Sequence, residues 1–121
     1  MNFELSQRFY FEAAHTLRRQ VDVEPSLRIH GHTYIAEVTL AGQPDPASGM
    51  VVDLALLRRE IETLRLQLDH RFLDEVADLG PATLENLAAY IWRAMHTVYG
   101  DKLACVEVKR DASGDTCRVR R

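Results

Sequence analysis

The sequence predicts an α+β fold, with an antiparallel four-stranded sheet and two helices on one of its faces. Near both ends of the chain, apolar residues alternate with polar ones, which is typical of half-buried strands. In the middle of the chain, apolar residues recur at spacings of three and four, which is typical of amphipathic helices. The resulting order is strand, strand, helix, helix, strand, strand. Helices grouped between pairs of strands indicate an α+β arrangement rather than alternating strands and helices.

The first two strands are expected at about residues 2–14 and 30–40, and both present histidine on their apolar face. Odd-numbered positions from 3 to 13 are apolar except for one glutamine, and the next odd position is His15. Even-numbered positions from 30 to 40 begin with His30 and His32 and continue with apolar residues. Because strand side chains alternate between two faces, all three histidines are expected on the inner face of the sheet.

These three histidines form a candidate metal site. Residues i and i+2 of a strand lie about 6.5 to 7 Å apart at Cα, so two imidazoles can lean onto one ion. A neighbouring antiparallel strand can supply a third ligand, and three neutral imidazoles with an open fourth position are a known layout for catalytic zinc. The alternative is that one or two of them are hydrogen-bonded core histidines. For His15, His30 and His32 together, we favour a Zn²⁺ site.

Two helices follow, each with recognisable ends. Asp53 is expected to cap the first helix, and Gly100 is expected to end the second, which opens at Pro81 and Thr83. His96 lies off the apolar face of the second helix, so we interpret it as a surface histidine. The apolar face of the first helix consists of Leu54, Leu57, Ile61, Leu64 and Leu68, and that of the second of Leu84, Leu87, Ala88, Ile91, Met95 and Val98.

Two last strands are expected at residues 103–110 and 116–121, joined by a turn at Ser113 and Gly114. Ala104, Val106 and Val108 are expected to share one face of the first of these. A four-stranded sheet has exposed edges, which proteins normally cover or pair. We therefore expect neighbouring subunits to close the sheet in a homo-oligomer.

Length and charge limit the classes of function. A chain of 121 residues is near the usual size of one domain, so we expect a single domain over residues 1–121. A net charge of −3 gives no reason to expect nucleic acid or an anionic membrane as a partner. No apolar run approaches the roughly 18 to 20 residues of a membrane span, and no signal-peptide pattern is present. Two cysteines, Cys105 and Cys117, do not make a disulfide framework, so we expect a cytoplasmic protein with free thiols.

Five segments, taken in order, resemble the 6-pyruvoyl-tetrahydropterin synthases and the related 6-carboxytetrahydropterin synthases. They are residues 11–15, 30–32, 49–54, 68–73 and 81–88. The resemblance implies the tunnelling fold, in which three subunits close their sheets into a barrel and two trimers stack. It also implies active sites between subunits, which use zinc to act on 7,8-dihydroneopterin triphosphate. Members of this family release triphosphate and either remodel or cleave the pterin side chain.

The resemblance also implies roles for individual residues. His15, His30 and His32 match the zinc ligands, and Asp69 with His70 matches a proton relay. For this pair, the alternative is a purely structural charge at a helix end, where histidine is favoured by the helix dipole. Residues near the substrate are expected to include Thr83 and Glu85 in the last matching segment, and Arg18, Arg19 and Arg28 as candidates for phosphate contacts. Each of these arginines could equally be a solvated surface charge.

Two positions depart from the family pattern. The usual catalytic cysteine, four residues before the first histidine of the His-x-His pair, is replaced by Ser26, whose hydroxyl is a far weaker base than a thiolate. Glu24 is a candidate carboxylate base in its place. At the end of the third expected strand, Arg110 occupies the position of a pterin-binding glutamate and cannot accept its hydrogen bonds, although Asp111 follows directly.

These departures leave three functions open. The first is a zinc-dependent lyase that acts on dihydroneopterin triphosphate or a close pterin relative. The second is a paralogue that cleaves the side chain to a hydroxymethyl-pterin through Glu24. The third is a catalytically silent zinc- or pterin-binding protein. A cupin-type metal protein shares the His-x-His element, but the two helical patterns argue against its all-strand fold.

Overall fold

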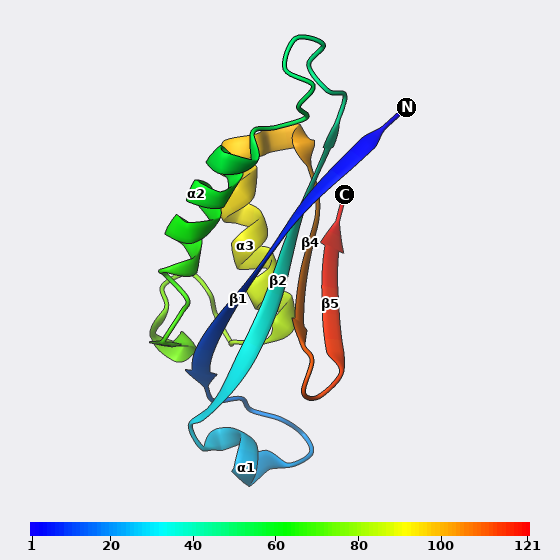
Figure 1. The fold of residues 1–121 in the computed structure, drawn as a ribbon. Helices are drawn as coiled ribbons and strands as arrows, with labels where there is room; N and C mark the ends of the chain where they lie inside the picture. Colours follow the sequence, from blue (N-terminus) through cyan, green and yellow to red (C-terminus); the bar gives the residue numbers. More distant parts are fainter.

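The computed structural model describes residues 1–121 and contains one five-stranded sheet with the strand order β3-β1-β2-β4-β5. Each neighbouring pair is antiparallel except β3 and β1, which run parallel. In Figure 1, the two long central strands cross the molecule from end to end, and both chain termini lie at the same end of the sheet. The strands are β1 (Phe3–His15), β2 (His30–Gly42), β3 (Arg71–Phe72), β4 (Leu103–Arg110) and β5 (Asp115–Arg120).

Two long helices, α2 (Leu54–Arg65) and α3 (Leu84–Tyr99), lie on the same face of the sheet (Figure 1). The short helix α1 (Val23–Leu27) lies beyond the sheet, next to the end of β1 and the start of β2 (Figure 1). Two single turns of 3₁₀ helix complete the fold, at Leu73–Glu75 and Gly100–Lys102. None of the helices is long and apolar enough to cross a membrane.

The predicted α+β class is confirmed, but the prediction of four strands is wrong. The fifth strand is β3, whose two residues pair with Ala13 and Ala14 of β1. A strand of two residues is too short to show alternation, and its pairing depends on how the segment after α2 returns to the sheet edge. The helix α1 was also missed, because it has only five residues and contains Pro25.

The predicted helix ends at Asp53, Thr83 and Gly100 are confirmed, but Leu68, which was expected on the first helix, lies beyond the end of α2 at Arg65. Asp53 accepts a hydrogen bond from the backbone N–H of Ala55 (2.8 Å), and Thr83 accepts one from that of Asn86 (3.1 Å). Such caps satisfy N–H groups that have no partner within the helix. Gly100 ends α3 with a φ of 54°, a conformation that glycine adopts without the steric cost of a Cβ atom.

The core lies between the helices and the inner face of the sheet, and two details differ from the predicted pattern. Leu103 is fully buried in place of Ala104, because the pairing of β2 with β4 shifts between Thr39 and Leu40. A shift of this kind reverses which side chains face inward beyond it. Val98 is not part of the buried face of α3; it is 48% exposed near the helix end.

The hairpin of β1 and β2 positions the histidines. Every residue of β1 pairs with β2, from Phe3 opposite Gly42 to His15 opposite His30. Stacked rings of Phe11 and Tyr34, with centroids 5.0 Å apart, fill the core directly beside the histidine end of this ladder. The last residue pairs of the β1–β2 ladder therefore bring three imidazoles onto the inner face of the sheet, at the end that α1 adjoins.

Candidate functional site

Three imidazoles converge where β1 ends and β2 begins. The Nε2 atom of His15 lies 2.9 Å from Nε2 of His30 and 3.1 Å from Nε2 of His32. One ligand atom from each of the three residues lies within 4.8 Å of the other two. His15 is almost fully buried, at 1% exposure, whereas His30 and His32 are partly exposed. The cluster is therefore closed on the core side and open on the other.

Backbone carbonyls fix the tautomers of two of these rings. Nδ1 of His15 donates to the carbonyl oxygen of Ala82 (2.8 Å), and Nδ1 of His30 donates to that of Arg28 (2.7 Å). Because a carbonyl oxygen can only accept, each Nδ1 carries the proton and each Nε2 presents a lone pair in the neutral ring. Two lone pairs then face each other across 2.9 Å, an arrangement that a bound cation stabilises.

The environment also favours the neutral form of His32 and His15. Burial lowers the pKa of His32 to about 4, with a further contribution from the positive charge of Arg110. Burial is likewise the main cause of the lowered pKa of His15, and the hydrogen bond to Ala82 acts in the opposite direction. Neutral imidazole is the form that binds metal ions.

The donor set fits zinc. Tetrahedral ligands about 2.0 to 2.1 Å from a zinc ion lie about 3.3 Å from each other. The Nε2 atom of His15 therefore needs to move only a few tenths of an ångström away from those of His30 and His32, which lie 2.9 and 3.1 Å from it. A carbonyl that accepts the second N–H of a ligating histidine is the usual outer partner at zinc sites. His15, His30 and His32 could hold the ion and leave a fourth position for water or a ligand.

Asp69 and His70 form a hydrogen-bonded pair at the edge of the sheet. Nδ1 of His70 donates to Oδ2 of Asp69 (2.8 Å), so Nε2 of the largely exposed His70 ring is free to exchange a proton. Asp69 also accepts from the backbone N–H of Glu12 (2.9 Å) and from Nη2 of Arg65 (3.2 Å). The Glu12 hydrogen bond is the main cause of the lowered pKa of Asp69, and His70 and Arg65 act in the same direction.

The same pair lies beside a surface groove of about 560 Å³. His70 stands at one side of this groove with a left-handed backbone (φ 57°), and its backbone N–H donates to the carbonyl of Glu12 (2.6 Å). His32 borders the groove as well, although no hydrogen bond joins His70 to the imidazole cluster. The groove is lined by Glu12, Ala13, Ala14, Gly31, His32, Thr33, His70, Arg71 and Phe72.

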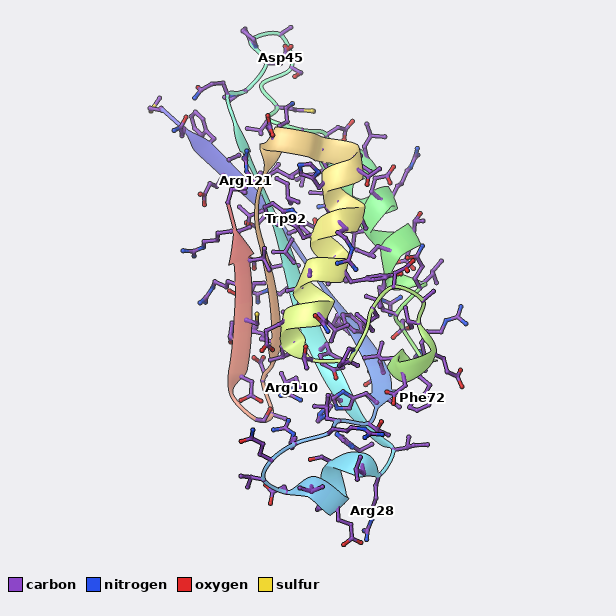
Figure 2. All side chains as sticks on the ribbon, turned by 180° about the vertical axis from the view of Figure 1, so that it is seen from behind. Arg28, Asp45, Phe72, Trp92, Arg110 and Arg121 are labelled. Carbon is purple, nitrogen blue, oxygen red and sulfur yellow. The ribbon has the colours of Figure 1, made fainter.

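Arg110 lies on the other side of the cluster, at the end of β4. Figure 2 shows it beside the end of the sheet that adjoins α1, with Phe72 across from it. Its side chain is only 12% exposed; Nη2 donates to Oδ2 of Asp115 (2.8 Å), and Nη1 lies 3.4 Å from Nε2 of His32. Hydrogen bonds from Ser113 and Arg110 lower the pKa of Asp115.

A second cavity, of about 350 Å³, adjoins Arg110. It brings together five residues that the sequence singled out, because the loop after β1 meets the start of α3 there. The hydroxyl of Thr83 is occupied as the cap of α3, whereas Glu85 is exposed. The lining consists of Leu17, Arg18, Arg19, Thr83, Leu84, Glu85, Arg110 and Asp115.

None of the remaining candidates forms a side-chain hydrogen bond with the imidazoles of its own chain. Glu24 is 82% exposed at its side chain and forms an ion pair with Arg28 (2.9 Å) on the outside of α1. Arg28 meets the cluster only through its carbonyl oxygen (Figure 2 shows its side chain pointing away from the sheet). Ser26 is buried, and Asp111 is exposed in the β4–β5 turn, 3.6 Å from Lys109. Asp111 thus pairs with Lys109, whereas Arg110 pairs with Asp115.

Three groups of the site were missed in the sequence. Asp115 faces Arg110 because these two residues pair across the β4–β5 hairpin, and the Ser113-Gly114 turn was the available signal for that pairing. The Ala82 carbonyl acts through its backbone, so no side-chain pattern reveals it. Tyr34 was recognised as apolar core, but its hydroxyl is buried near His32 without a hydrogen-bond partner, and burial raises its pKa to about 12.

Comparison with known proteins identifies the family. The family model described as 6-pyruvoyl tetrahydropterin synthase matches residues 4–121. The human 6-pyruvoyl tetrahydrobiopterin synthase is 37% identical over 110 residues, which cover 78% of this chain and 75% of the human protein. A dihydroneopterin monophosphate aldolase from Pyrococcus furiosus is 33% identical over 91 residues, which cover 75% of this chain and 73% of the aldolase. The structure of Caenorhabditis elegans 6-pyruvoyl tetrahydropterin synthase matches with a TM-score of 0.84 and 26% identity, covering all of this chain and 96% of that one. The chain therefore belongs to the 6-pyruvoyl tetrahydropterin synthase family.

Proposed function

We propose that this protein is a zinc-dependent lyase that acts on 7,8-dihydroneopterin triphosphate or a closely related dihydropterin. The observation that carries this proposal is the convergence of three Nε2 atoms, two of which present a lone pair because their Nδ1–H groups are bonded to carbonyl oxygens. Relatives named as a pterin synthase and as a dihydroneopterin phosphate aldolase support a pterin substrate. Bound zinc would act as a Lewis acid that polarises an oxygen of the substrate side chain.

Proton transfer is assigned to His70, with Asp69 as the residue that orients it. The Asp69 carboxylate holds the Nδ1 proton of His70, so the exposed Nε2 is the atom that takes or gives a proton. Asp69 itself is fixed by Glu12 and Arg65 and stays ionised near neutral pH. The pair thus keeps one ring orientation while it exchanges protons.

We infer that a complete site forms between subunits of a trimer or a dimer of trimers. His70 makes no hydrogen bond to the imidazole cluster of its own chain. Its ring is 77% exposed and is therefore accessible to a neighbouring subunit. Strand β5 has a free edge, because β4 is its only neighbour in the sheet. Apolar side chains are also exposed around α1, namely Val21, Val23, Leu27 and Ile29. Pairing of open edges and covering of these side chains would accompany assembly.

The identity of the catalytic base distinguishes the two candidate reactions. Ser26 has no hydrogen-bond partner at its hydroxyl that could activate it, so we assign it a weak role in the standard reaction. Glu24 lies on the exposed side of α1, where a neighbouring subunit could meet it. The P. furiosus aldolase favours a second candidate function, in which Glu24 acts as the base and the side chain is cleaved to give a hydroxymethyl-pterin.

One experiment separates these functions. Zinc-loaded protein is incubated with dihydroneopterin triphosphate and, separately, with dihydroneopterin monophosphate, and products are followed by mass spectrometry. Release of triphosphate with a remodelled or shortened side chain indicates the first function, and a hydroxymethyl-pterin that disappears in Glu24→Gln indicates the second. The His32→Ala variant, which lacks one metal ligand, is the matched negative control. Pterin binding without any turnover would refute both reactions and leave a silent binding protein.

A further inference from the structure

The guanidinium of Arg110 has more hydrogen-bond donors than the protein supplies acceptors. Nη2 is paired with Asp115, whereas Nε is buried without any acceptor. Nη1 has one contact, 3.4 Å from Nε2 of His32, which is near the limit of a hydrogen bond. A buried donor without a partner carries the cost of its lost hydration.

A cation in the imidazole cluster would remove the remaining acceptor. The lone pair on Nε2 of His32 can either accept from Arg110 or bind the ion, but not both. With the ion bound, Nη1 and Nε of a guanidinium that is only 12% exposed would both lack acceptors. Two positive charges would also lie close together on either side of one imidazole, which is unfavourable unless a negative group offsets them.

The cavity beside Arg110 has the charge to receive such a group. Its volume is about 350 Å³, and it is lined by Arg18, Arg19 and Arg110 together with two carboxylates. Asp115 is already paired with Arg110 and Ser113, so Glu85 is the one carboxylate without an ion pair. Arg18 and Arg19 are exposed and take part in none of the ion pairs of the chain.

We propose that this cavity binds a carboxylate or phosphate group of the ligand, held by Arg110 next to the imidazole cluster and by Arg18 and Arg19 at the rim. Guanidinium groups suit these anions because their planar array of N–H groups matches two oxygens at once. The inference rests on the proposed function, since it specifies the substrate class of the same site. The ligand of this chain therefore carries an anionic oxygen on the side that faces Arg110.

Anion binding can be measured without turnover. Acetate, inorganic phosphate and inorganic triphosphate are titrated separately into the metal-free and the zinc-loaded protein by calorimetry. We expect at least one of them to bind, and more tightly when zinc is present; the acetate and phosphate arms distinguish the two possible sources. Arg110→Gln is expected to weaken binding about tenfold or more, because a charge-assisted hydrogen bond is lost. Arg120→Gln, which removes the same charge from an exposed position on β5 outside the cavity, should leave it unchanged.

Further variants keep the test decisive even if Arg110→Gln disturbs folding. Replacing Arg110 unpairs Asp115, whereas Arg18→Gln with Arg19→Gln alters only exposed residues and should weaken binding several-fold. Glu85→Gln removes an opposing charge and should tighten it. The inference is overturned if none of the three anions binds, if the Arg18/Arg19 double variant binds like the wild type, or if Arg120→Gln weakens binding as much as Arg110→Gln. Zinc binding without any effect of these anions would refute this inference alone, whereas failure to bind zinc would refute the proposed function as well.

Discussion

Asp69→Asn is expected to destabilise the protein in a way that depends on pH. The Asp69 carboxylate accepts three hydrogen bonds, from the backbone of Glu12, from Arg65 and from His70, and its side chain is only 13% exposed. Asparagine keeps one acceptor oxygen but turns an amide donor toward one of these donors. Hydrogen bonds to a charged group contribute about 1.5 to 3 kcal/mol each, and partial retention leaves an expected loss of about 2 kcal/mol at pH 7.

The pH dependence follows from the direction of the pKa shift. The folded protein lowers the pKa of Asp69 from its ordinary value of 3.8, so the ionised form stabilises the fold. This contribution is fully present above the unfolded-state pKa and is lost as the pH falls through the lower folded-state pKa. The difference in free energy of unfolding between wild type and Asp69→Asn should therefore be constant near neutral pH and shrink below about pH 4.

Urea-induced unfolding at a series of pH values measures this difference directly. Asp111→Asn is the control, because this exposed carboxylate has only a 3.6 Å contact with Lys109. Its effect should stay within about 0.5 kcal/mol at every pH. A loss for Asp69→Asn no larger than that of the control at pH 7, or a loss that persists unchanged at acidic pH, would refute the hydrogen-bonding role assigned to Asp69.

Three further changes test the metal site and its surroundings. His32→Ala should lower zinc affinity at least about 100-fold, measured by competition with a chromophoric chelator, while His96→Ala on the exposed side of α3 should leave it unchanged. Tyr34→Phe removes a buried hydroxyl without a partner and should raise the free energy of unfolding of the metal-free protein by about 1 kcal/mol; a decrease would show that the hydroxyl makes a stabilising contact. Ser26→Cys should raise triphosphate release from dihydroneopterin triphosphate if only the base is missing, and an unchanged rate would place the defect elsewhere in the site.

The strongest predictions from the sequence were those set by local chemistry. The helix ends at Asp53, Thr83 and Gly100 depend on groups within a few residues of each position, so the sequence contains the whole signal. The shared face of His15 and His32 follows from the period of two along each strand, and the structure brings both onto one cluster. Local periodicity therefore predicted the elements and the grouping of the histidines.

What was missed depends on contacts between distant segments. Residues 71–72 become a strand only because they return to the edge of β1, and Leu103 is buried only because the ladder between β2 and β4 shifts at Thr39. The pairing of Arg110 with Asp115 requires the register of a hairpin whose turn allows more than one pairing. Glu24 was considered for its distance from the histidines along the chain, but a five-residue helix turns its side chain outward.

Because the β1–β2 ladder is uninterrupted, the positions of the histidines do not depend on the sequence of the loop beside them. His15 and His30 are held opposite each other by cross-strand pairing, and not by the fourteen-residue connection from 16 to 29, of which only the carbonyl of Arg28 supports an imidazole. A one-residue insertion within either strand would rotate its histidines to the opposite face and dismantle the cluster. Insertions or exchanges before Arg28 would leave the cluster intact, since the entropy of closing a loop changes slowly with its length. This connection is thus a segment in which substrate preference can diversify, by natural drift or by grafting, on an unchanged metal-binding frame.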